Sequence, residues 1–337
     1  MKNKVLLFTL LGFFVLFMGV VGILLVLSLI FGGNRNSDFS ISDNKIAIIE
    51  LNGTIDNSEK INALIKKAKD NSSVKAIVLR INSPGGMVGA SQEIYQEVTT
   101  ARSEGKIIVS SMGDLGASGA YYIACGTDKI VANPGTLTGS VGVIMNFMNW
   151  QGLMSNKLGL QFYNIKSGRF KDSGTPNRPM TDDEKQYFQG VIDNVFSQFL
   201  EVVIKGREDS IREVLTHQKM ELPPLGESTS HLKGKDIAKV RAEITFTEIS
   251  TFIKDYTEGN IYSGQQAYEA GMIDKLGNLN TAIELAADMA GIKDKNKYKL
   301  IYLKPRELGL FDKVFGETAQ AMNPIKNSHL TMQYIMP

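Results

Sequence analysis

The sequence predicts an α/β fold, because two runs typical of buried strands each lead through a glycine-rich turn into a segment of helical composition. Residues 74–81 are apolar and rich in β-branched side chains, and they precede a Pro-Gly-Gly turn and a helix-like stretch from Ala90. Residues 106–112 form the second such run, and Ser118 begins the helix-like segment after it. Both units therefore end in a strand-to-helix elbow.

The two elbows contain the residue types that acyl transfer requires. Glycine lets the backbone approach a ligand closely, and the N–H groups at a helix start carry a partial positive charge. Residues 82–86 read Asn-Ser-Pro-Gly-Gly, so the Gly86 amide is a candidate donor to an oxyanion. In the second elbow Ser118 is a candidate nucleophile and the Gly119 amide a second donor. The alternative for a single elbow is a serine cap and an ordinary turn.

Three motifs in order carry a resemblance to a known family. The third follows the two elbows, where residues 128–143 read Asp-Lys-Ile-Val-Ala-Asn-Pro-Gly-Thr-Leu-Thr-Gly-Ser-Val-Gly-Val. The two βα units resemble the core of the ClpP/crotonase superfamily. The motifs resemble the signal peptide peptidase A family, the S49 serine peptidases, from about Lys45 to Ala290. The resemblance implies a ClpP/crotonase-like domain of repeated ββα units.

The resemblance also implies a catalytic pair. The serine of the Ala-Ser-Gly motif is the family's nucleophile, and this role falls on Ser118. The family's base is a lysine within Lys-Ser-Gly-x-x-Lys-Asp, which residues 166–172 match, so the base is Lys171 and Lys166 is the weaker candidate. The chain departs from the family pattern at Ala120, where a second glycine is usual. Alanine is small, and we expect the elbow to persist.

The composition favours a lysine base independently of the resemblance. The chain has three histidines, and none of them is near a motif: His217, His231 and His329. A free lysine amine has a pKa near ~10.4, so only about one in 2,500 is neutral at pH 7. Burial against apolar walls lowers such a pKa by several units. We therefore expect the Lys171 amine to be desolvated in the assembled site. Ser140 is either an orienting partner for this amine or a structural turn serine.

The amino-terminal segment predicts a membrane anchor. Residues 5–32 contain no charge and, at about 1.5 Å per residue, are long enough to cross a hydrocarbon layer of ~30 Å. The run is longer than the apolar part of a cleaved signal peptide, and it ends in no Ala-x-Ala site. Lys2 and Lys4 favour a cytoplasmic position for residues 1–4 and an extracytoplasmic one for the catalytic part. A polar linker, residues 33–43, follows.

The remaining chain divides into a peptidase domain and a tail. The domain covers residues 44–292, and the family pattern does not explain an insertion at residues 208–256. An amphipathic helix over residues 182–205 precedes this insertion, which is a lid, an oligomer contact or a neutral surface segment. Residues 293–337 form the tail, which is a possible self-substrate because family members trim their own termini.

Charge and composition exclude several function classes. The 37 basic and 35 acidic residues give a net charge of +2, which does not indicate nucleic acid as a partner. The sequence has no metal-ligand spacing of histidines and carboxylates and no phosphate-binding loop, so we expect no metal and no cofactor. Its one cysteine, Cys125, excludes an intrachain disulfide and is interpreted as a buried, unreactive thiol.

The resemblance implies assembly and substrates as well. Relatives form rings, stacked trimers or octameric domes in which serine and lysine come from neighbouring subunits, so we expect a homo-oligomer. With the anchor in a lipid membrane, the expected substrates are peptides at its outer surface, including signal peptide remnants. The alternatives are a related membrane peptidase that trims a stomatin-like partner, a crotonase-type acyl-CoA enzyme, and a catalytically silent scaffold. Lys171 argues against the scaffold.

Overall fold

The computed structural model describes residues 16–19, 22, 44–222, 225, 234–305 and 333–335. The chain divides into two compact units, Met1–Ser42 and Asp43–Pro337. The anchor predicted over residues 5–32 and the linker over residues 33–43 lie almost entirely outside the described residues. Within the described part, no helix combines the length and apolar character needed to cross a membrane.

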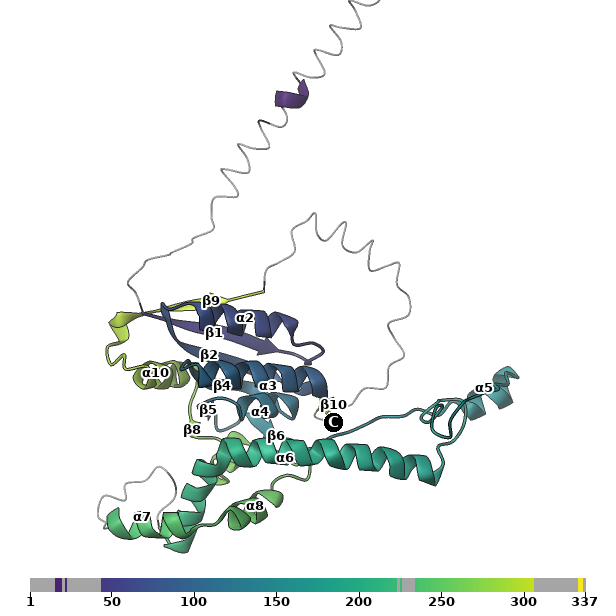
Figure 1. The fold of residues 1–337 in the computed structure, drawn as a ribbon. Coiled ribbons are helices and arrows are strands. Elements are labelled where there is room, and N and C mark those ends of the chain that lie inside the picture. Colours follow the sequence, from purple (N-terminus) through teal and green to yellow (C-terminus); the bar gives the residue numbers. More distant parts are fainter. Residues whose placement is uncertain are drawn as a thin grey trace, which may run out of the picture. The chain divides into compact units, whose positions relative to one another are not determined.

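A mostly parallel sheet forms the centre of the second unit (Figure 1). Along its main path the strands follow the order β7-β6-β4-β2-β1-β9, with β5 beside β4 and β8 beside β5. Only the pairing of β6 with β7 is antiparallel among these described strands. The strands are β1 (Asn44–Asn52), β2 (Val74–Ser83), β4 (Ile107–Ala117), β5 (Lys129–Ala132), β6 (Leu137–Gly139), β7 (Ile261–Ser263), β8 (Lys275–Leu276) and β9 (Tyr298–Leu303).

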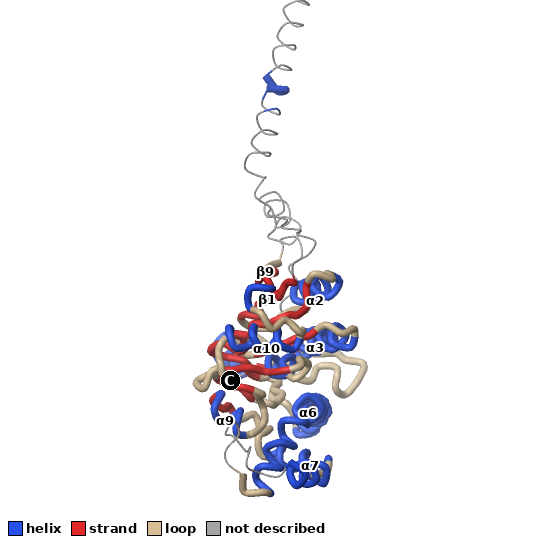
Figure 2. Tube along the Cα trace, turned by 90° about the vertical axis from the view of Figure 1, so that its left-hand side faces the viewer, coloured by secondary structure: helices blue, strands red, loops and turns tan. Residues whose placement is uncertain are grey.

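Apolar side chains cover both faces of this sheet, as expected for parallel strands buried on two sides. Along β1, Ala47 and Ile49 belong to one core cluster, whereas Ile46 and Ile48 belong to the other. Figure 2 shows helices on both sides of the strands. The first cluster packs under α2 (Glu59–Asp70), α3 (Val88–Ser103) and α4 (Gly119–Ala124), and the second under α10 (Leu279–Met289). The predicted strands at 74–81 and 106–112 and the helices after both elbows are confirmed.

Helix α6 is longer than the amphipathic pattern predicts, because it runs from Asp182 to Lys219 without a break at Gly206. A Cβ atom at Gly206 would lie 2.2 Å from the carbonyl oxygen of Cys125, so this glycine lets α6 pack closely against the end of α4. Two further helices of the 208–256 insertion, α7 (Gly234–Glu243) and α8 (Phe246–Lys254), pack against α6. Within this insertion, the sequence Pro-Pro-Leu-Gly-Glu-Ser-Thr-Ser of residues 223–230 predicts an exposed loop, and these residues lie outside the described part of the chain, apart from Leu225.

The tail contributes two strands that its sequence pattern does not predict. After a short 3-10 turn (Lys295–Lys297), β9 pairs in parallel with β1 and extends the sheet beyond residue 292. Near the carboxyl terminus, β10 (Gln333–Ile335) pairs antiparallel with β3 (Gly85–Met87). The remaining short helix, α9 (Gly264–Glu269), follows β7.

Between β6 and α6 the chain leaves the sheet and forms an extension, residues 144–180, which we call the arm (Figure 1). Its helix α5 (Gln151–Leu158) has no buried residue. The exposed large apolar side chains of the arm include Met148, Leu153, Leu158, Phe162, Tyr163 and Ile165. Exposed apolar side chains that gather in one region of a soluble protein mark an interaction surface.

Candidate active site

Ser118 occupies a strained elbow between β4 and α4. Its φ of 55° and ψ of −122° lie outside the regions that L-residues usually adopt. Two backbone hydrogen bonds hold it there, since its N–H donates to the Gly139 carbonyl at 2.8 Å and its carbonyl accepts from the Tyr122 N–H at 2.9 Å. Other hydrolases aim a nucleophilic serine from a strained strand-to-helix turn of this type.

The Ser118 hydroxyl is buried and unsatisfied. The residue is 0 % exposed, and its Oγ has no hydrogen-bond partner among the described residues. A buried hydroxyl in this state costs about 1–3 kcal/mol, and such groups are few in native proteins. The geometry fits a nucleophile whose partners arrive with the substrate or with another copy of the chain.

The two candidate oxyanion donors belong to different elements. Gly119 is the first residue of α4, so its N–H has no acceptor within that helix. Gly86 lies on β3 instead of at the start of α3, which begins at Val88. A Cβ atom at Gly86 would lie 2.1 Å from the carbonyl oxygen of Ile55, so no larger residue fits. Because β3 packs against α4, Gly86 and Gly119 come from neighbouring elements.

The backbone of β3 is paired on both edges. On one edge, Ile55 donates to the Gly85 carbonyl at 2.9 Å and accepts from the Met87 N–H at 2.7 Å. The backbone groups of Gly86 therefore point to the other edge, where the register sets Gly86 opposite Tyr334 of β10. Strand β10 also lies against α3 and α4. A short extended segment of this chain thus lies beside the helix that follows Ser118.

Lys171 lies on the arm, within a turn whose backbone is closed by its own N–H donating to the Gly168 carbonyl at 3.2 Å. Its side chain is exposed. In the described part of the chain, its amine makes no hydrogen bond or ion pair, either with Ser118 or elsewhere. Within one chain the structure does not bring Lys171 and Ser118 together. The desolvation expected for this amine is therefore not a property of the single chain.

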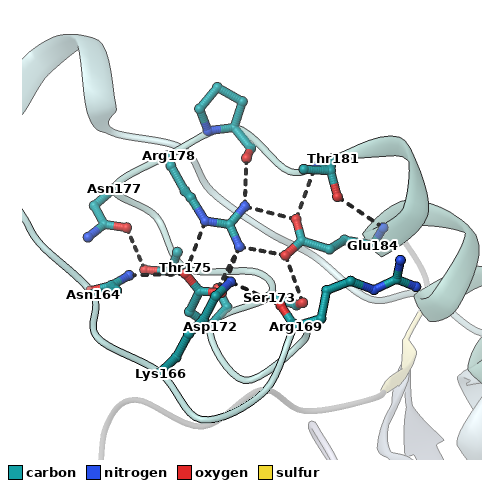
Figure 3. Close-up of polar contacts among 11 residues, drawn as sticks. Asn164, Lys166, Arg169, Asp172, Ser173, Thr175, Asn177, Arg178, Thr181 and Glu184 are labelled. Carbon is teal, nitrogen blue, oxygen red and sulfur yellow. Dashed lines mark hydrogen bonds and ion pairs between the residues drawn. The ribbon is translucent and has the colours of Figure 1, made fainter.

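A charged network surrounds this turn (Figure 3). Arg178 donates to both oxygens of Asp172, at 2.9 Å and 3.2 Å, and to both oxygens of Glu184. Lys166, which lies outside any strand, also donates to Asp172. The guanidinium of Arg178 and the Lys166 amine hold the pKa of the Asp172 carboxyl well below its usual range. Arg178 does the same for the pKa of Glu184.

The sequence reasoning missed this network and the support of Ser118 by Gly139. A capping signature, Thr181 with Glu184 three residues later, marks the start of α6 and was the available signal for Glu184. No local sequence pattern indicated that Arg178 would form hydrogen bonds with Asp172. Cys125 is buried as predicted, and burial raises the pKa of its thiol to about 12.

Comparisons with known proteins relate the chain to peptidases. The family model of Peptidase family S49 matches residues 100–219, a range that includes Ser118 and Lys171, and the Clp protease model matches residues 34–136. A putative protease of Synechocystis is 34% identical over 258 residues, which cover 76% of this chain and 78% of the relative.

Two further similarities are weaker. A putative signal peptide peptidase SppA of Enterococcus faecium is 28% identical over 256 residues, and the match covers 72% of this chain and 63% of the relative. Among solved structures, a mutant of the 1510-N membrane-bound stomatin-specific protease in complex with a substrate peptide is 14% identical. The match covers 82% of this chain and 99% of the solved chain, with a TM-score of 0.40.

The match to the Synechocystis relative covers most of both chains, and the range matched by the S49 family model includes Ser118 and Lys171. The chain therefore belongs to peptidase family S49, the serine peptidases that its motifs resemble.

Proposed function

We propose that this chain is a membrane-anchored serine endopeptidase with a Ser118–Lys171 dyad, which degrades remnant signal peptides and other membrane-associated peptides. One observation carries the proposal: an extended segment, β10, pairs with β3 and lies against α4, directly beside the elbow that holds Ser118. An edge that accepts backbone from an extended segment suits peptide substrates of varied sequence, because main-chain hydrogen bonds supply the affinity.

The proposed chemistry assigns one role to each residue. Ser118 Oγ attacks the scissile carbonyl, and the Lys171 amine takes the hydroxyl proton. The N–H groups of Gly86 and Gly119 hold the oxyanion of the tetrahedral intermediate. When that intermediate collapses, the C–N bond breaks and Lys171 returns the proton to the leaving amine. Water then repeats the attack on the acyl-enzyme with the same base.

The dyad is proposed to form between two copies of the chain. Lys171 is exposed on the arm, whereas Ser118 is buried beside the sheet with its hydroxyl unsatisfied. The exposed apolar side chains of the arm, such as Leu153 and Phe162, provide a surface for a neighbouring copy. Packing of the arm onto that copy would desolvate the Lys171 amine, as a lysine base requires. A ring or dome of such contacts closes the assembly.

The membrane location rests on the sequence of residues 5–32. An uncharged apolar run of this length anchors the chain, and the lysines before it favour an extracytoplasmic catalytic domain. A site tethered at that surface meets peptides that leave the bilayer, which is the reason for proposing signal peptide remnants as substrates.

Labelling with a fluorophosphonate tests the activity directly, because this reagent requires an activated serine. Full-length wild type in detergent is expected to be labelled and to cleave an unstructured peptide. Ser118→Ala and Lys171→Ala are expected to do neither. Labelling that persists in Lys171→Ala would overturn the dyad. Cleavage restricted to a stomatin-like protein, with no cleavage of peptides, would favour the partner-specific alternative.

A further inference from the structure

Asp172 follows the proposed base directly, and this adjacency is unfavourable for catalysis. A carboxylate beside a lysine amine stabilises the protonated form of that amine and so opposes its use as a base. The dyad proposed above therefore needs a device that keeps Asp172 from pairing with Lys171. The structure contains such a device around Arg178 (Figure 3).

The acceptor positions of Asp172 are occupied by other donors. Its Oδ1 accepts from the Lys166 amine and from Arg178 Nη2 at 2.9 Å, and its Oδ2 accepts from Arg178 Nε at 3.2 Å and Asn164 Nδ2 at 3.3 Å. A carboxylate has about four lone-pair positions, and these four contacts use them. Two cations also neutralise its charge. In Figure 3 Asp172 faces Arg178 and Lys166.

Arg178 joins this carboxylate to a second one on α6. Its Nη1 donates to Glu184 Oε2 at 2.8 Å, and its Nη2 donates to Glu184 Oε1. Glu184 also accepts from the Ser173 hydroxyl at 2.8 Å and from the Thr181 N–H at 2.9 Å. The side chain of Glu184 is 4 % exposed. One planar guanidinium therefore ties the turn that carries Lys171 to the buried first turn of α6.

We propose that Arg178 is a positioning residue for the Lys171 base: it holds the Asp172 carboxylate away from the amine and, through Glu184, fastens the turn to α6. This inference rests on the proposed dyad. It concerns the charge around the base. The ion-paired side chains of the turn, of the segment after it and of the start of α6 contribute to that charge, namely Lys166, Arg169, Asp172, Arg178, Asp182, Asp183, Glu184 and Lys185.

The direction of the effect follows from these charges. Loss of the Arg178 side chain removes one positive charge and frees two acceptor positions on Asp172, the carboxylate next to the base in the chain. Both changes favour a protonated amine. The acidic limb of the pH–activity profile then moves to higher pH, while activity recovers where the base is neutral again. A purely structural role would instead lower activity by one factor at every pH.

The experiment compares kcat/KM between about pH 6 and pH 10 for the full-length assembled protein and its variants. Arg178→Gln is expected to move the acidic limb up by about one pH unit and to lower kcat/KM near pH 7 about tenfold, with KM little changed. Arg178→Lys keeps the charge without the fork and is expected to shift the limb less. The matched control is Arg169→Gln, which also removes one positive charge from this turn, but from a solvent-exposed pair with Asp183 that is screened by water and salt. Its acidic limb should shift clearly less than that of Arg178→Gln.

A double variant identifies the carboxylate. Asp172→Asn combined with Arg178→Gln is expected to move the limb back toward wild type. An unshifted limb in both Arg178 variants, or an equal loss of activity at all pH values, would overturn the inference. If Arg178→Gln does not assemble, Arg178→Lys and Asp172→Asn still decide between these outcomes. Lys171→Ala, measured beside them, separates the two proposals. If Lys171→Ala retains activity, the proposed dyad is wrong. If Lys171→Ala is inactive, the dyad holds, and the Arg178 variants test the positioning role by itself.

Discussion

The backbone N–H of Ser118 donates to the carbonyl oxygen of Gly139 at 2.8 Å, and this bond ties the strained elbow to β6. The end of β6, which supplies this acceptor, also has an unusual backbone conformation, with positive φ angles at two successive residues. Gly139 has a φ of 82° and Ser140 a φ of 51°, and the Ser140 N–H donates to the Asn260 carbonyl at 2.7 Å. These contacts support the structural turn role for Ser140. The third motif of the sequence thus stabilises the backbone at the second.

Replacement of Gly139 is expected to damage the elbow. A Cβ atom there would lie 2.8 Å from the ring of Tyr262, and a φ of 82° is costly for alanine. Gly139→Ala should destabilise the fold by about 1–3 kcal/mol and reduce fluorophosphonate labelling of Ser118. Chemical denaturation and labelling rates measure both effects. Gly135→Ala is the control, because nothing lies within 4 Å of its Cβ position. Equal behaviour of the two variants would contradict this role of Gly139.

Mixing two inactive variants tests whether Ser118 and Lys171 act across a subunit contact. Each single variant, Ser118→Ala or Lys171→Ala, is expected to lose activity by a factor of ~10³ or more. After dissociation and reassembly of an equal mixture, roughly a quarter of the contacts combine an intact serine with an intact lysine. Peptide hydrolysis should therefore return to a comparable fraction of wild type. No recovery in a verified mixed assembly would mean that both residues belong to one subunit.

The carboxyl terminus is expected to be a self-substrate cut at a defined bond. The register of β10 sets Tyr334 opposite Gly86, the proposed oxyanion donor, so the carbonyl of Tyr334 is the expected point of attack. Incubated wild type should lose residues 335–337, and intact mass spectrometry detects this loss. Ser118→Ala should keep its full mass under the same conditions. Identical masses of the two proteins would contradict processing at this site.

Acid is expected to weaken a buried ion pair beneath α6. Arg207, only 2 % exposed, donates to Asp274 at 2.8 Å, and Lys129 donates to the same carboxylate at 3.0 Å. Burial opposes ionisation of Asp274, but Arg207 and Lys129 outweigh it and lower the pKa to about 2. Because this pKa is below the unfolded value near ~3.9, the stabilisation is present above about pH 4 and is lost as pH falls toward 2.

Replacement of Asp274 by asparagine should show the same linkage. The change leaves Arg207 buried without its counter-charge and should cost about 3–5 kcal/mol at pH 7. Urea unfolding measures the cost, and the difference from wild type should narrow near pH ~3. Asp209→Asn removes an exposed partner of Arg241 at 3.5 Å and should cost less than about 1 kcal/mol. A cost for Asp274→Asn that does not change with pH would exclude this electrostatic origin.

Local sequence was sufficient for the elements that carry the elbows. The β-branched run at 74–81 became β2, and the run at 106–112 became the first part of β4, because strand propensity and glycine punctuation act over a few residues. The same reasoning ended α6 too early. Gly206 is a weak helix former, but its contact with Cys125 depends on a residue 81 positions away. Strands β9 and β10 were missed for a similar reason, since their pairing partners are distant in the chain.

The sequence by itself determined the family, the identity of the serine elbow and the candidate lysine, because these depend on ordered motifs of adjacent residues. Only the tertiary structure decided that a hydrogen bond to Gly139 holds the strained backbone of Ser118, that β10 pairs with β3, and that Arg178 donates to the Asp172 carboxylate. It also placed Lys171 on an exposed arm, where its amine makes no hydrogen bond with Ser118 of its own chain. The physical reason is that strain, edge pairing and charge neutralisation arise from contacts between distant segments, which no local pattern records.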